Sequence, residues 1–124
     1  MRVYTETVTV GVNATGDATS YTTAYINGQI VSVAYVKDDY ANGVDWDITG
    51  ETSGINIWSE DNVNAAKTVS PTQPTHTQAG VAALYAAAGT AVNAPIFVAD
   101  ERIKIIVDEG GVSTSGSFVF TWVT

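Results

Sequence analysis

The chain has 124 residues and a mass of 13.0 kDa, which is the size of one domain, and we take that domain to span residues 1–124. Its 45% hydrophobic and 15% charged residues exclude a disordered polar tail. Because the chain contains no Cys, it has no cysteine nucleophile, disulfide scaffold or thiolate metal site, and because His76 is its only histidine, it has no multi-histidine metal site. The formal net charge of −8 disfavours nucleic acid and anionic membranes as partners, because both repel a negative surface.

The apolar residues predict sheet rather than helix. The chain contains 17 Val, 9 Ile and 17 Thr but a single Leu, Leu84. β-Branched side chains lose rotamer freedom in helices and pack well on pleated surfaces. Residues 3–12 alternate between apolar and polar and predict the first strand. Residues 21–26 and 29–37 predict two more, and Asn27-Gly28 between them is the strongest short signal for a hairpin.

The middle of the chain contains a second strand pair and the one helical pattern. Residues 44–49 and 54–59 predict two strands joined by a short turn, and an irregular stretch with two prolines follows. We expect a helix over residues 77–89, with Thr77 as its N-cap and Gly89 just past its end. Its alanine-rich run favours a helix, and it offers one apolar stripe, made of Val81, Leu84, Tyr85 and Ala88.

The last third of the chain predicts three further strands, at residues 96–99, 102–108 and 117–123. Seven or so short strands separated by turn residues are typical of an all-β protein. The sequence therefore predicts an antiparallel β-sandwich or small barrel, with the helix at 77–89 covering one open end.

Carboxylates are the first candidates for a site. Asp45 and Asp47 flank Trp46 on one strand face, which suits acid–base chemistry or Ca²⁺ ligation, but no EF-hand loop is present. We favour the alternative interpretation, a solvated strand face with Trp46 on the opposite, buried side. Four pairs of adjacent acids lie at element ends, at residues 38–39, 60–61, 100–101 and 108–109. Adjacent residues of a strand point to opposite faces, so we interpret these pairs as solvation and edge protection.

Nucleophilic and phosphate-binding chemistry find little support. His76 could act as a base for Ser70 or Ser113, but the chain has no Gly-x-Ser-x-Gly elbow, and we interpret His76 as a helix-entry residue. Gly110-Gly111 lacks the Lys of a phosphate loop and precedes a strand, which favours a flexible hairpin tip. We therefore expect no enzymatic activity, no cofactor and no metal.

Two sets of side chains are candidates for binding. The first set consists of four aromatic rings, those of Tyr35, Tyr40, Trp46 and Trp58. They could form a platform that stacks on sugars, or they could lie in the core, and we favour the core. Arg102 and Lys104 share one strand face and either meet an acidic partner or pair with acids of their own chain. Terminal strands can add to a neighbour's sheet, so the interface candidates are Val3, Tyr4, Thr5, Arg102 and Lys104.

The C-terminal part of the chain contains four sequence blocks that carry a family resemblance. The blocks are Trp-Ser-Glu-Asp-Asn-Val-Asn-Ala at 58–65, Pro-Thr-His-Thr-Gln-Ala-Gly at 74–80, Leu-Tyr-Ala-Ala-Ala-Gly at 84–89 and Val-Ala-Asp-Glu-Arg-Ile-Lys-Ile at 98–105. Over residues 46–124 the chain resembles a family of small proteins encoded by tailed bacteriophages and prophages among their virion structural genes. The most specific part is the block at 99–104 with the Gly-Gly loop after it.

The resemblance implies a non-catalytic virion protein and carries over no catalytic residues. The expected function is that of a capsid cement or decoration protein that binds the major capsid protein or other virion proteins and stabilises the head shell. The alternatives are a neck or tail component, such as an adaptor or spike element, and a carbohydrate-binding module of the virion. We expect a homo-oligomer, for example a trimer, assembled in the host cytoplasm; no apolar signal core follows Met1, and no run approaches the ~18 residues that cross a bilayer.

Overall fold

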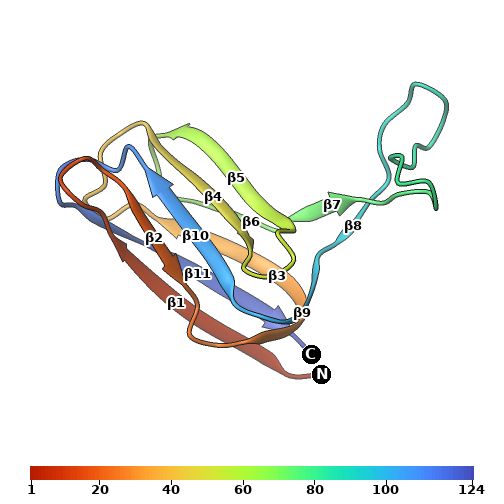
Figure 1. The fold of residues 1–124 in the computed structure, drawn as a ribbon, viewed down its shortest axis with the longest axis horizontal. Coiled ribbons are helices and arrows are strands. Elements are labelled where there is room, and N and C mark those ends of the chain that lie inside the picture. Colours follow the sequence, from red (N-terminus) through yellow and green to blue (C-terminus); the bar gives the residue numbers. More distant parts are fainter.

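The computed structural model describes residues 1–124 as an antiparallel β-sandwich from which one long arm projects (Figure 1). The expected all-β class is confirmed, and the chain contains no helix. The strands are β1 (Val3–Gly11), β2 (Ala18–Tyr21), β3 (Ile26–Val36), β4 (Val44–Gly50), β5 (Asn56–Val63), β6 (Lys67–Val69), β7 (Thr72–Pro74), β8 (Asn93–Pro95), β9 (Phe97–Glu101), β10 (Ile103–Asp108) and β11 (Ser115–Val123).

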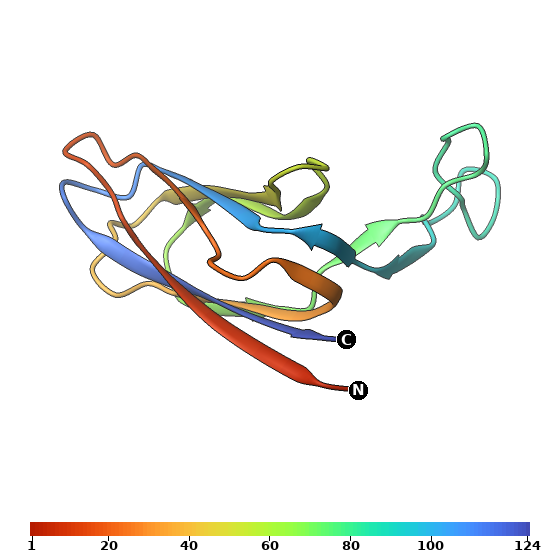
Figure 2. The ribbon, with the colours of Figure 1, turned by 60° about the horizontal axis from the view of Figure 1, so that its bottom comes forward.

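Two sheets form the layers of the sandwich (Figure 2). Sheet A has the order β1-β11-β3, and the far edge of β3 is shared by β6 and β9. Sheet B has the order β2-β10-β4-β5. Strands β7 and β8 pair only with each other and form the base of the arm. Because β10 lies in sheet B and β11 in sheet A, the Gly110-Gly111 loop is an arch between the sheets and not the predicted hairpin tip.

The core lies between the two sheets and follows the alternation of the strands. It contains 22 buried hydrophobic residues, among them Ile103, Ile105 and Val107 of β10 and Phe118 and Phe120 of β11. Burying a large apolar side chain contributes roughly 1.5–3 kcal/mol, so this cluster is the main source of stability. All of its members lie outside residues 72–95, which means that the sandwich has a complete core without the arm.

The hairpin predicted at Asn27-Gly28 is wrong. These residues lie inside β3, which runs without a turn from Ile26 to Val36. Gly28 has a φ of 143°, and a Cβ at this position would collide with the carbonyl oxygen of Val123. The glycine is therefore needed for close approach of two chain segments, at a point where the register of β3 against β9 also shifts.

The helix predicted over residues 77–89 is also wrong. The backbone of this segment pairs with its two flanks: the Ala83 N–H donates to the carbonyl of Thr75 at 2.9 Å, and the Val92 N–H donates to the carbonyl of Ala83 at 2.9 Å. Gly89 closes a tight turn to the carbonyl of Ala86 instead of ending a helix. A helix this short is marginal in water without a surface to pack against, and the expected apolar stripe has none here, because the segment projects beyond the sandwich (Figure 2).

The arm consists of residues 72–95, and we call residues 75–92 its tip. The tip is a small meander, with isolated bridges from His76 to Ala82 and from Leu84 to Ala91. The arm leaves the edge of sheet A, because β6 precedes it and β9 follows it. The protein has no helix that could cross a membrane.

Candidate interaction surfaces

The arm is uncharged and exposes large apolar side chains. None of the five Lys and Arg or 13 Asp and Glu residues lies in the 32 residues from Thr68 to Ala99. Three large apolar side chains of the tip are exposed, Val81 by 64%, Leu84 by 44% and Tyr85 by 76%. Exposed apolar side chains that gather in one place mark interaction sites.

Hydrogen bonds fix the shape of the tip. Its base is closed by the Thr75 N–H and hydroxyl, which both donate to the carbonyl of Val92 at 2.8 Å. The Tyr85 N–H donates to the carbonyl of Thr90 at 3.1 Å and closes the outer loop. The tip therefore presents its side chains from an ordered backbone, which lowers the entropy lost on binding.

The N-terminal interface candidates lie on the free edge of sheet A. Val3 is 63% exposed, and the hydroxyl oxygens of Thr5 and Thr121 lie 3.5 Å apart on the outer face. Tyr4 points the other way and stacks on Trp122, with ring centroids 5.6 Å apart. Val3 and Thr5 are thus open to a partner, whereas the Tyr4 ring packs against Trp122 at the end of the core.

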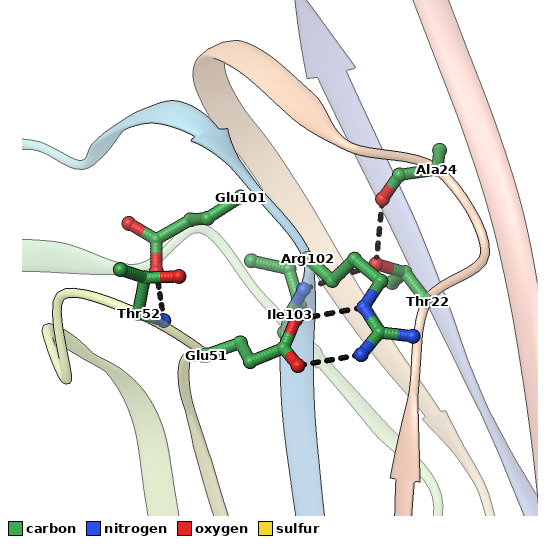
Figure 3. Close-up of polar contacts among 7 residues, drawn as sticks. All are labelled: Thr22, Ala24, Glu51, Thr52, Glu101, Arg102 and Ile103. Carbon is green, nitrogen blue, oxygen red and sulfur yellow. Dashed lines mark hydrogen bonds and ion pairs between the residues drawn. The ribbon is translucent and has the colours of Figure 1, made fainter.

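Arg102 is held by its own chain (Figure 3). Its Nε donates to Oε2 of Glu51 at 2.7 Å and its Nη2 to Oε1 at 2.5 Å, while the guanidinium lies 4.6 Å from the ring centroid of Tyr21. The hydrogen bond from Arg102 lowers the pKa of Glu51. Arg102 therefore pairs with an acid of its own chain, which is one of the two alternatives that the sequence left open. Lys104 lies on the same face as Arg102, and in the register of sheet B it pairs with Tyr21 of β2 and Thr49 of β4.

Sequence reasoning missed the buried acid Glu101, which is 6% exposed. Its Oε1 accepts a hydrogen bond from the N–H group of Thr52 at 2.9 Å (Figure 3). It accepts a second from the N–H group of Ser53 at 3.0 Å, and so holds the β4–β5 turn against β9. Burial opposes ionisation of Glu101, but the hydrogen bonds from Ser53 and Thr52 outweigh it and lower the pKa. The sequence showed only an Asp-Glu pair at a strand end, because the partners lie about fifty residues away.

An acidic depression lies on the outer face of sheet B. Trp46 is buried and Asp45 and Asp47 point outward, which confirms the solvated-face interpretation. The depression has a volume of about 430 Å³ and is lined by five carboxylates, those of Asp17, Asp45, Asp47, Asp61 and Asp108. A hydrogen bond with Asp17 and its negative charge raise the pKa of Asp108. No three acidic or histidine side chains are arranged to hold a metal ion.

The remaining sequence candidates are dispersed. His76 is exposed on the arm, and Ser113 lies in the arch between β10 and β11, at the opposite end of the sandwich (Figure 1). The helix-entry interpretation of His76 is wrong, because no helix follows it. The four rings proposed as a sugar platform are all buried, with 8% exposure at most, so the core interpretation is confirmed for them: Tyr35, Tyr40, Trp46 and Trp58.

Comparison with known proteins adds no relationship: no family model matches the chain, and no curated protein matches it.

Proposed function

We propose that this chain is a structural protein of a bacteriophage virion, a capsid cement or decoration protein that binds neighbouring shell subunits through its arm. The observation that carries the proposal is the uncharged, projecting arm with exposed Val81, Leu84 and Tyr85. The resemblance to small phage virion proteins supports it, since two of the four blocks, at 74–80 and 84–89, lie in the arm.

The physical argument rests on where free energy of binding is available. Apolar surface contributes about 25 cal/mol for each Å² removed from water, and the tip exposes its large side chains on an ordered backbone. A partner pocket that covers them gains this free energy without displacing charges. One tip offers few such side chains, so stable attachment comes from many copies, or several arms in one oligomer, acting together on a lattice.

The test uses particles that carry this protein. Stripping it from them and measuring heat or osmotic rupture addresses the cement role, and we expect stripped particles to rupture under milder conditions. Unchanged rupture would remove the cement role. A copy number of a few per particle, measured by quantitative gel, would contradict a decoration protein and favour a neck or tail component.

A shortened variant tests the arm itself. Thr75 and Val92 are hydrogen-bonded to each other, so a two-residue Asn-Gly turn can replace residues 76–91 between them. We expect this variant to unfold like the unmodified protein, because the core lies outside the arm, and to fail to restore stripped particles. Restoration by the shortened variant would refute the role of the arm.

A pair of matched point variants completes the experiment. Tyr85→Asp places a charge on the tip, and Val112→Asp places the same charge on the 73% exposed Val112 in the arch. We expect the first to lose attachment and the second to retain it. Equal loss in both variants would mean that added negative charge, and not the tip, governs attachment.

A further inference from the structure

The outer face of sheet A carries no charged side chain. Aligned residues of antiparallel strands point to the same face, and Val8 and Val10 of β1 point into the core, so their neighbours in β1 point outward. Four rows form most of the outer face: Val3, Val123, Gln29 and Phe97; then Thr5, Thr121 and Ser32; then Thr7, Val119, Ala34 and Thr68; and last Thr9, Ser117 and Val36. The face continues into Asn27 and Ala99 at one end and into Gly11 and Ser115 at the other.

The outer face of sheet B is the opposite in character. Its rows include Asp45 opposite Asp108 and Asp47 opposite Ile106, and Asp17 and Asp61 line the same depression. Lys104 is the only basic side chain in these rows. Of the two large faces, only the outer face of sheet B thus carries charged side chains.

We propose that the outer face of sheet A packs against the same face of a second copy of this chain and forms a two-fold symmetric dimer. Two chains with a net charge of −8 repel each other, and burying like charges at an interface is costly. Contact through sheet B would bring ten carboxylates together, whereas contact through sheet A buries only Val, Thr, Ser, Ala, Gln and Phe side chains. Of the two large faces, the outer face of sheet A is therefore the one through which two copies can pack without burying like charges.

The size of the face fits a stable dimer. It is four strands wide and nine residues long, which gives roughly 19 by 30 Å at the usual strand spacing and rise. This is a projected area of roughly 570 Å² on each chain, or roughly 1,100 Å² for the pair, which exceeds the total of about 1,000 Å² that a biological interface should bury. Exposed apolar side chains lie on it, with Val3 at 63%, Val36 at 39% and Phe97 at 64% exposure.

The proposed assembly is a dimer and differs from the trimer named above as an example of the expected homo-oligomer. It leaves both arms available, so a dimer would attach at two points. The dimer does not depend on the virion role, because its tests need only the purified protein.

Sedimentation velocity measures the assembly. At about 100 µM, where a dimer of micromolar affinity is fully formed, we expect the mass of two chains. Thr121→Lys, at the centre of the face, and Thr7→Lys, on its exposed edge strand, should both give monomers with unchanged circular dichroism. Thr19→Lys changes the net charge equally but lies on sheet B, opposite Ile106, and should remain a dimer. A monomeric or trimeric unmodified protein, or dimers in both sheet A variants, would overturn the proposal.

Crosslinking reports the geometry independently, because the chain contains no Cys. Thr121→Cys introduces one thiol at the centre of the face, and Thr19→Cys introduces one on the opposite sheet. Packed sheets lie about 10 Å apart, so a thiol-to-thiol reagent of that length should join two Thr121→Cys chains rapidly and leave Thr19→Cys chains unjoined. Equal crosslinking of the two variants would contradict contact through sheet A.

Discussion

Two buried tyrosines differ in one hydrogen bond, and their replacement by phenylalanine should have different effects on stability. Tyr35 and Tyr40 are each 1% exposed and stack on each other, with ring centroids 6.2 Å apart. The Tyr40 hydroxyl donates to the carbonyl of Val10 at 2.5 Å, whereas the Tyr35 hydroxyl has no partner. The pair therefore separates the contribution of a buried hydrogen bond from that of a buried ring.

The magnitudes follow from this difference. Tyr40→Phe removes the hydrogen bond and leaves the Val10 carbonyl without this donor, which should lower the free energy of unfolding by about 1–2 kcal/mol. Tyr35→Phe removes a hydroxyl that was desolvated without compensation, so stability should stay the same or rise by up to about 1 kcal/mol. Burial raises the pKa of Tyr35 to about 12 and that of Tyr40 further, so neither effect should depend on pH near neutrality.

Urea unfolding followed by tryptophan fluorescence measures both variants, since the Trp46 ring lies 4.4 Å from that of Tyr35. The m-values should match that of the unmodified protein, which would show that the midpoint shifts reflect stability. An equal loss in the two variants would refute the reasoning, because it would mean that the Tyr35 hydroxyl is bonded in solution. An unchanged Tyr40→Phe midpoint would refute it as well.

Three further variants probe single contacts. Glu101→Gln weakens two charge-assisted hydrogen bonds from the β4–β5 turn and should lower the free energy of unfolding by about 1–2 kcal/mol at neutral pH. Because the folded-state pKa of Glu101 is lowered, this loss should disappear as pH falls through that pKa, and a loss in thermal stability that does not depend on pH would contradict the argument. Asp108→Asn should raise the Tm at neutral pH, because it removes the repulsion between Asp108 and Asp17. Since the pKa of Asp108 is raised, this gain in Tm should shrink as pH falls through that pKa, and a gain that grows in acid would contradict the argument. Gly28→Ala should destabilise by at least about 1–3 kcal/mol, because its Cβ would meet the carbonyl of Val123, and an unchanged unfolding midpoint would show that the backbone there can yield.

The class of the protein and most of its strands could be predicted from local sequence patterns alone. Alternation with a period of two is a local property, so Val8, Val10 and Phe118 identify their buried faces without knowledge of their neighbours. The same patterning placed Trp46 in the core and Asp45 outside it. The residues of a single strand are enough to predict which of its faces is buried.

Which segments pair with one another depends on contacts between distant parts of the chain. The run from Val81 to Gly89 has the propensity of a helix, but no core lies beside it, and its backbone pairs with its own flanks instead. Asn27-Gly28 has the sequence of a turn, but the close approach of Val123 keeps it within a strand. Charge segregation between the sheets and the Arg102–Glu51 pair also depend on strand order, which is set by contacts between residues distant in the chain. Local propensity is worth a few tenths of a kcal/mol to about 1 kcal/mol per residue, so the burial and pairing of whole strands override it.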